Sequence, residues 1–272
     1  MLRKPRIEYD GAFYHIIVRG NQRQMIFKDP SDFEKYLQII SSYKQRHHFR
    51  LYSYVLMSNH LHLLIETQVV PLSKTLQGIN QSYTMFFNRK YHTVGHLFQG
   101  RYKAILCDRE RYLLALLKYI HHNPVRAKLS ETPSRYRWSS DRAYRSGRGG
   151  DGPVESETVL RLYSENRSRA RQKYMDFMDD GVTVKKQEVY ATIDQRLLGD
   201  DWFVDRIAEE PCGSVKKERR KREYTLAQLA GAVAQAGEIG LDDLRGNGRQ
   251  REIAQGESGI YGPCEGIWLS GE

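Results

Sequence analysis

The chain has 272 residues, of which 40% are hydrophobic and 28% are charged, and its formal net charge is +10. This length allows one domain of ordinary size and a further piece, and the apolar fraction is enough for a buried core. The first residues lack the apolar core of a signal peptide, and no apolar run approaches the ~20 residues of a membrane span. These features predict a cytoplasmic protein that is neither exported nor inserted into a membrane.

The charge is distributed unevenly along the chain. Residues 1–150 contain 25 of the 43 Lys and Arg residues and 10 of the 33 Asp and Glu residues, a balance of +15, whereas residues 151–272 carry a balance of −5. A basic segment of this kind favours a polyanionic partner, and nucleic acid is the usual one. A basic surface that only keeps the protein in solution would give the same balance.

The first half of the chain alternates between strand and helix patterns. The predicted elements are a strand at 11–19, a helix at 29–48, two strands within 51–66, a helix at 71–91, a strand at 102–107 and a helix at about 109–122. Asp108 is the expected N-cap of the last helix, and Pro124 is expected to end it. The order strand, helix, strand, strand, helix, strand, helix is typical of an α+β domain with helices packed on an antiparallel sheet.

Two histidines stand on the second strand of the 51–66 segment. Because side chains alternate between the faces of a strand, His60 and His62 point to one side, while Leu61 and Leu63 point to the other. Neutral imidazole is a common ligand of divalent metals, so the pair is half of a candidate metal site. Without a third ligand from elsewhere, the pattern is more typical of two half-exposed histidines on a sheet face than of a metal site.

The helix that follows the last predicted strand carries the candidate third ligand. Tyr119 and Asn123 are four residues apart, which makes them neighbours on one helical face, beside the apolar stripe rather than within it. If this face docks near the histidine pair, the amide oxygen of Asn123 completes a three-ligand site and the Tyr119 hydroxyl is a candidate nucleophile. Tyr112 is the rival nucleophile, because it lies two turns earlier on nearly the same face.

The segments MSNHLHLLIE and YIHHNPVRA resemble the single-tyrosine HUH transposases, in particular the REP-associated tyrosine transposases found beside palindromic repeats in bacterial genomes. The similarity continues in YHIIVRGNQRQMIF, GHLFQGRYKAILCD and YRWSSDRAY and covers residues 1–148. It implies the ferredoxin-like, RRM-like version of the α+β fold. It also implies that His60 and His62 bind a divalent ion, Mg²⁺ or Mn²⁺. The resemblance further implies that Asn123 is the third ligand of the ion and that Tyr119 is the nucleophile that attacks DNA.

The reaction that this resemblance implies is a metal-dependent transesterification of single-stranded DNA without a nucleotide cofactor. Its product is a 5′-phosphotyrosine link that a later 3′-hydroxyl reverses, so that strands are cut and rejoined. The implied substrate is a palindromic-repeat hairpin with flanking single-stranded bases, and a monomer is favoured over a homodimer. Two other interpretations remain open: a nucleic-acid-binding regulator that has the same fold but is catalytically idle, and a metal-dependent hydrolase in which Tyr119 is structural.

Basic side chains alternate with aromatic rings at 101–103 and 135–138. Cations neutralise phosphates and aromatic rings stack on unpaired bases, which is the combination used to bind single strands. Trp138 would serve equally well as a core anchor. The predicted nucleic-acid contacts are Arg19, Arg101, Lys103, Arg126, Arg135 and Arg137.

Four further polar residues lie close to these motifs. His15, on the first predicted strand, is interpreted as a sheet residue that contacts DNA or neighbouring side chains rather than as a ligand. His121 and His122 occupy other helical faces than Tyr119 and are assigned to structure or to phosphate contact. Glu66 is expected either to orient a ligand histidine or to lie at a solvated strand end.

A glycine-rich run at 145–153 is the best candidate for a domain boundary. The predicted organisation is a single-tyrosine transposase domain at 1–148, a linker and helical region at 149–223, and a third segment at 224–272. Apolar spacing between 155 and 207 is typical of two or three helices. The third segment resembles the start of the helix-turn-helix domain of bacterial replication initiators. Its last residues lack helical periodicity, which predicts an incomplete domain with a disordered tail.

Overall fold

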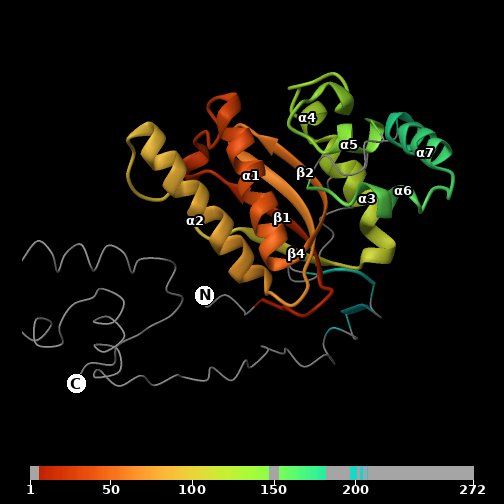
Figure 1. The fold of residues 1–272 in the computed structure, drawn as a ribbon, viewed down its shortest axis with the longest axis horizontal. Helices are drawn as coiled ribbons and strands as arrows, with labels where there is room; N and C mark the ends of the chain where they lie inside the picture. Colours follow the sequence, from red (N-terminus) through yellow and green to blue (C-terminus); the bar gives the residue numbers. More distant parts are fainter. Residues whose placement is uncertain (1–5, 147–152, 182–196, 201–202, 205–206, 208–272) are drawn as a thin grey trace, which may run out of the picture. The chain divides into compact units, whose positions relative to one another are not determined.

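In the computed structural model of the chain, five strands form one central sheet (Figure 1). The structure describes residues 6–146, 153–181, 197–200, 203–204 and 207. These residues lie within one unit of the chain, which ends at Val215. The prediction made for 224–272 falls outside the described residues.

The strands follow the predicted order along the chain. They are β1 (Phe13–Arg19), β2 (Arg50–Met57), β3 (His60–Glu66), β4 (Lys103–Cys107) and β5 (Leu197–Leu198). Their order in the sheet is β2-β3-β1-β4-β5; the first four strands pair antiparallel, and β5 pairs with β4 in parallel. This arrangement of β1 to β4 confirms the predicted ferredoxin-like class. The expected sheet is wholly antiparallel, however, and β5 makes the observed sheet mixed.

The helices also begin and end close to the predicted residues. They are α1 (Pro30–His47), α2 (Leu72–Tyr91), α3 (Arg109–His121), α4 (Asn123–Arg126), α5 (Asp141–Ser146), α6 (Ser156–Leu160) and α7 (Arg167–Asp179). The Asp108 side chain caps α3 as predicted, since it accepts hydrogen bonds from the amides of Glu110 and Arg111. Among the described residues, no helix is long and apolar enough to cross a membrane.

α3 ends before Pro124, as predicted, but Asn123, the residue before the proline, begins a further helical turn instead of leaving the helical region. α3 stops at His121, and the chain turns directly into the single turn of α4, in which Pro124 is the second residue. Proline is tolerated in a first helical turn, because the N–H group that it lacks would have no partner there. The change of direction between α3 and α4 places Asn123 at the start of a new helix.

Different helices cover the two faces of the sheet (Figure 1). α1 and α2 pack on one face, on a core that includes Ile16, Leu61 and Leu63. α3, α5, α6 and α7 pack on the other face, where Leu64 lies in the core. The alternation along β3 is therefore as predicted, and His62 and the other even-numbered side chains of β3 face α3.

An irregularity in β2 turns two successive side chains towards α3. The register of β2 with β3 shifts between Leu51 and Ser53, so that Tyr52 and Ser53 share the face that α3 covers. The Tyr52 hydroxyl donates to Glu66 at 2.7 Å, and the Ser53 hydroxyl lies 3.0 Å from Nε2 of His121. The bulge thereby supplies polar partners both to β3 and to α3.

The helices after the glycine-rich run pack on the same face of the sheet as α3. Leu160 of α6 and Tyr174 and Met178 of α7 belong to the core that contains Leu116 of α3. The predicted helical region between 155 and 207 therefore contains α6 and α7. The division of the chain at residues 148 and 223 stays a prediction, and the described helices after residue 148 are joined to the first domain by this shared core.

Candidate active site

Three histidines and one tyrosine meet on the α3 face of the sheet, and we call them the histidine cluster. Nε2 of His15 on β1 lies 2.9 Å from Nδ1 of His62 on β3, and the two ring centroids are 5.2 Å apart. The ring of His60 lies 5.4 Å from that of His62. The ring of Tyr119 on α3 lies 5.9 Å from His15 and 6.3 Å from His62. The structure thus brings the helical tyrosine to the histidine pair.

Strand pairing explains why His15 belongs to this cluster. β1 and β3 are antiparallel neighbours, with Ile17 opposite His62 and Arg19 opposite His60. His15 is therefore a diagonal neighbour of His62 on the same face, within reach of a ring contact. His15 and His62 come together because β1 and β3 are neighbours in the sheet. A reader of the sequence would need the order of the strands to relate the two histidines.

Both histidines of β3 keep a ring nitrogen that can bind a metal. Oδ1 of Asn59 lies 2.7 Å from Nδ1 of His60. An amide oxygen only accepts, so Nδ1 of His60 carries the proton and Nε2 the lone pair. His15 occupies Nδ1 of His62, and the tautomer protonated there leaves Nε2 of His62 for a ligand. A partner on the second ring nitrogen is typical of metal-binding histidines, so these residues fit a divalent ion.

The imidazoles of the cluster are neutral near pH 7. Burial lowers the pKa of His15 to about 3. Burial, together with the nearby Arg19 guanidinium, lowers the pKa of His60 to about 4. The pKa of His62 lies well below its ordinary value, first because of burial and then because of His15. A neutral ring has a lone pair available for a metal, whereas a protonated ring has none.

Cations surround the histidine cluster. Arg19 lies opposite His60 in the β1–β3 register and is exposed, and Lys103 of β4 is also exposed. Lys103 and Arg126 both lower the pKa of His15, which shows that their charges act at the cluster. Three of the predicted nucleic-acid contacts therefore surround the same site.

Asn123 and Arg126 are both anchored to the backbone of Tyr119. Nδ2 of Asn123 donates to the Tyr119 carbonyl at 3.1 Å, which leaves its Oδ1 to act as a ligand. Arg126 donates to the same carbonyl at 2.7 Å, and its guanidinium carbon lies 3.9 Å from the centre of the Tyr119 ring. Within the described part of the chain, no group of three His, Cys, Asp or Glu side chains could hold a metal ion. Asn123 stays the predicted third ligand.

Tyr119 is more deeply placed than its position in the sequence indicates. It is 4% exposed and belongs to the core of the α3 face. The prediction that it lies beside the apolar stripe is wrong, because the ring turns inwards onto the histidines. The rival Tyr112 is half-buried and lies near Arg111. No ring contact joins Tyr112 to the cluster in the segments that the structure describes.

Two of the remaining predicted DNA contacts are engaged within the protein. Arg137 donates to Glu34 at 3.0 Å, and Arg135 pairs with Glu131. Arg101 is exposed. These arginines stay predicted contacts, but the ion pairs of Arg135 and Arg137 compete with phosphate binding.

Trp138 packs as a core anchor, one of the two roles considered for it. Its ring stacks on Phe33 of α1 at 4.4 Å between centroids, with an angle of 11° between the planes. The guanidinium of Arg137 lies 4.5 Å from the centre of the Trp138 ring. The Trp138 ring therefore already packs against two side chains of the protein, those of Phe33 and Arg137.

Glu66 has neither of its two expected roles. Its carboxylate accepts a hydrogen bond from Tyr52 and lies 3.3 Å from nitrogens of both Arg50 and Arg109, and the residue is only 7% exposed. Three elements therefore meet at Glu66, since Arg109 is the first residue of α3 and Arg50 begins β2. The carboxylate fastens α3 to the sheet and does not contact a histidine of the cluster.

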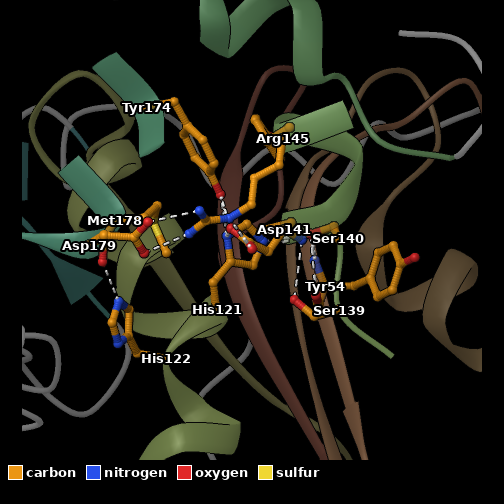
Figure 2. A network of polar contacts seen from close by, with 12 residues as sticks. Tyr54, His121, His122, Ser139, Ser140, Asp141, Arg145, Tyr174, Met178 and Asp179 are labelled. Carbon is orange, nitrogen blue, oxygen red and sulfur yellow. Dashed lines mark hydrogen bonds and ion pairs between the residues drawn. The ribbon is translucent and has the colours of Figure 1, made fainter. Parts of the chain in front are cut away.

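His121 lies in a second polar group, the His121 network, which consists of Ser53, His121, Ser140, Asp141 and Tyr174 (Figure 2). Nε2 of His121 lies 2.7 Å from the Ser140 hydroxyl, and Nδ1 lies 2.9 Å from the Tyr174 hydroxyl, which donates to Asp141 at 2.6 Å. Burial lowers the pKa of His121 to about 4, although Asp141 opposes the shift. His121 is wholly buried, so of its two assigned roles only the structural one fits.

Comparison with known proteins extends these observations. Residues 9–123 match the family model of IS200-like transposases. A solved REP-associated tyrosine transposase bound to a REP hairpin is 17% identical, with a TM-score of 0.46, and the alignment covers 55% of this chain and 87% of that chain. A protein from Deinococcus radiodurans R1, provisionally described as a transposase, is 16% identical, with a TM-score of 0.32, over 43% of this chain and 93% of that chain. No curated protein matches the chain.

The family match covers the part of the chain that contains the candidate site. The matched segment runs from Tyr9, before β1, to Asn123, the first residue of α4, and includes the whole histidine cluster. Over residues 9–123 the chain is similar to the IS200-like transposases. The resemblance seen in the sequence motifs is thereby confirmed at the level of the family.

Proposed function

We propose that the chain is a transesterase of single-stranded DNA that cuts and rejoins strands through a covalent bond to Tyr119. The observation that carries the proposal is the position of the Tyr119 ring against His15 and His62. A phenol is a useful nucleophile when it is held beside groups that bind the reacting phosphate. Tyr119 lies beside the histidines of its own chain, which supports a monomer that uses its own tyrosine.

The reaction exchanges one phosphoester for another. The Tyr119 oxygen attacks phosphorus and loses its proton, while the bond from phosphorus to the 3′-oxygen breaks and that oxygen takes up a proton. The fragment downstream of the cut is joined to Tyr119 through its 5′-phosphate, as a 5′-phosphotyrosine, and the upstream fragment ends in a 3′-hydroxyl. Because the number of ester bonds does not change, a later 3′-hydroxyl can reverse the step without a nucleotide cofactor.

His60, His62 and the amide oxygen of Asn123 are the residues that would hold a divalent ion. When bound, such an ion polarises a phosphate oxygen and stabilises the charge that develops on it. Mixed nitrogen and oxygen ligands suit Mn²⁺ at least as well as Mg²⁺, which prefers oxygen. Asn59 and His15 fix the rings of His60 and His62 through their Nδ1 atoms, so that both Nε2 atoms are presented.

The surroundings of the cluster support an anionic substrate. Arg19, Lys103 and Arg126 place positive charge around neutral imidazoles, where it can attract phosphates. The resemblance of the motifs to the REP-associated branch supports a hairpin with flanking single-stranded bases as the substrate. In this proposal the cations bind the strand that enters the site.

A denaturing gel tests the proposal directly. The protein is incubated with Mn²⁺ and labelled hairpin DNA drawn from repeats that flank its own gene, and a slow, protease-sensitive DNA–protein adduct is expected. Tyr119→Phe and the double variant His60→Ala/His62→Ala should form none. Tyr112→Phe is the matched control, because it removes a hydroxyl from the same helix away from the cluster, and it should form adduct like the unmodified protein.

Three outcomes would contradict the proposal. DNA binding without an adduct in any lane would indicate a catalytically idle regulator. Cleavage by Tyr119→Phe that leaves both product ends unattached would indicate a hydrolase that uses water, with Tyr119 in a structural role. An adduct that disappears in Tyr112→Phe and persists in Tyr119→Phe would mean that Tyr112 is the nucleophile.

A further inference from the structure

The last turn of α3, which carries Tyr119, is held by α7 and the residue after it (Figure 2). Three contacts join the two helices on both sides of the tyrosine. They are Lys118 Nζ with Asp180 Oδ1, His121 Nδ1 with the Tyr174 hydroxyl at 2.9 Å, and His122 Nε2 with the Met178 carbonyl at 2.9 Å. The turn that presents the nucleophile is therefore fastened to a helix about fifty residues later in the chain.

These contacts involve groups that cannot change partners easily. Lys118 is 2% exposed and His121 is wholly buried, so water cannot replace a partner that moves away. Leaving a buried ammonium or imidazole without its partner is unfavourable, because its polar atoms would have no hydrogen bond. Nζ of Lys118 also lies 4.6 Å from the centre of the Phe177 ring, a second contact with α7. A shift of α7 would therefore carry the last turn of α3 with it.

α7 is itself fixed to α5. The Tyr174 ring stacks on Tyr144 with centroids 4.9 Å apart, and its hydroxyl donates to Asp141. Arg145 joins both helices, since it donates to Asp141 at 2.7 Å and to Asp179 at 2.8 and 2.9 Å. α5 and α7 are thus fastened to each other as well as to the last turn of α3.

The other end of α3 does not depend on α7. Arg109 pairs with Glu66 on β3, and the amide of Asp108 donates to the Leu198 carbonyl at 2.9 Å. The family match ends at Asn123, so α7 lies outside it. α7 therefore makes its polar contacts at the last turn of α3, and that turn contains the nucleophile.

We propose that α7 is a positioning element for the nucleophile, and that Tyr174 and Asp180 are positioning residues that fix the orientation of Tyr119. The inference rests on the proposed function. A nucleophile that must attack one phosphorus and later leave it needs a fixed geometry, and a displacement of about 1 Å can lower a rate about a hundredfold. Neither residue has to touch DNA or metal for this effect.

Tyr174→Phe removes the hydroxyl and keeps the ring that stacks on Tyr144. At saturating protein, with Mn²⁺ and hairpin DNA, we expect the single-turnover rate of adduct formation to fall by about tenfold to a hundredfold. The Kd for the hairpin should not change. Tyr83→Phe is the matched control, because it removes another buried hydroxyl, bonded to the Ile26 carbonyl at 2.6 Å on the opposite face of the sheet. It should lower thermal stability similarly and leave the rate unchanged.

A second pair of variants separates positioning from folding. Asp180→Asn removes the carboxylate that pairs with Lys118 and should slow adduct formation, whereas Asp180→Glu keeps a carboxylate and should restore most of the rate. If Asp180→Asn and Tyr174→Phe both react at the rate of the unmodified protein, the inference is wrong. Equal slowing by Tyr83→Phe would also overturn it, because the effect would then follow stability alone.

Amide hydrogen exchange tests the inference without DNA or metal. In Tyr174→Phe we expect the amides of 118–122 to exchange on the order of tenfold faster than in the unmodified protein, with no change at 109–114. This result would support the inference even if the unmodified protein formed no adduct, in which case the proposed function alone would fail. Exchange that is unchanged at 118–122, or equally faster along all of α3, would overturn the inference.

Discussion

The histidine cluster and the His121 network lie on the same face of the sheet, and both bury imidazoles against α3, but their surroundings differ. Around His121 the partners are hydroxyls and a carboxylate, from Ser140, Tyr174 and Asp141. Around the histidine cluster the charged neighbours that act on the imidazoles are Arg19, Lys103 and Arg126. The His121 network thus contains a negative charge of its own, whereas the charged side chains around the histidine cluster are positive.

The charge of the neighbouring side chains distinguishes His121, which has a structural role, from the histidines of the candidate active site more clearly than burial does. The pKa of both His15 and His121 is lowered, chiefly by burial, so the direction of the shift does not distinguish them. What distinguishes them is the chemistry that would complete each group. The His121 network already contains its carboxylate, whereas the histidine cluster, in the proposed function, would be completed by a metal ion together with a phosphate of the substrate.

The largest expected effect comes from removing the metal ligands. His60→Ala/His62→Ala should lower the rate of adduct formation at least about a thousandfold. Mn²⁺ at about a hundred times its Kd should stabilise the unmodified protein by about 2.7 kcal/mol and should leave this variant unaffected. Thermal unfolding with and without Mn²⁺ measures the second effect.

The control for this prediction is His92→Ala/His96→Ala, which removes two exposed histidines after α2. It should retain the Mn²⁺ stabilisation and the activity. A loss of Mn²⁺ stabilisation in the control, or its persistence in His60→Ala/His62→Ala, would show that the ion binds somewhere other than the histidine cluster.

The second largest expected effect is a loss of stability in a variant of the His121 network, with metal binding unchanged. His121→Ala leaves the hydroxyls of Ser53, Ser140 and Tyr174 without their imidazole partner, and we expect the free energy of unfolding to fall by about 3 kcal/mol. Urea denaturation measures this loss. The stabilisation by Mn²⁺ should persist in His121→Ala, because the two groups use different residues. Its disappearance would show that they act as one site.

The sequence predicts the elements of the fold well, because their signals are local. Asp108 marks the start of α3, and the alternation from His60 to Leu63 assigns the two faces of β3 without knowledge of any other strand. The spacing of Tyr119 and Asn123 also places them one turn apart. Each of these inferences depends on residues within a few positions of one another.

What the sequence does not predict depends on contacts between distant segments. The role of His15 follows from the adjacency of β1 and β3, and the burial of Tyr119 follows from the way α3 packs on both strands. The bulge at Ser53 and the contact of α7 with α3 join residues far apart in the chain. Glu66 shows the same limit, since its partners Arg50 and Arg109 come from two other elements.

A smaller effect tests whether His15 acts on the metal site through His62. His15→Phe keeps a ring of similar size and removes the nitrogen that contacts Nδ1 of His62, so Mn²⁺ affinity should fall by about tenfold to a hundredfold. Isothermal titration calorimetry measures this change. His47→Phe is the matched control, because His47 is a buried histidine bonded to Thr75 at 2.9 Å, outside the histidine cluster. An unchanged affinity in His15→Phe would assign His15 to packing alone.

The smallest expected effect concerns the cations that make the histidine cluster different from the His121 network. If Arg19 binds a phosphate, Arg19→Gln removes one counterion-releasing contact, and the slope of log Kd against log salt for single-stranded DNA should decrease in magnitude by about 0.7. Arg111→Gln is the matched control, since that exposed guanidinium pairs with Asp200 at 2.7 Å and is not among the predicted contacts. Its slope should match that of the unmodified protein.

Fluorescence anisotropy over a range of salt concentrations distinguishes these two arginines, and the result decides what the comparison means. A smaller slope in Arg19→Gln alone would place the phosphates at the histidine cluster, where cations lie close to neutral imidazoles. Equal changes in both variants would show that DNA binds broadly over the basic surface. The charge around the cluster would then steer the strand without holding it, and the position of the scissile phosphate would depend on the metal ligands and on Tyr119.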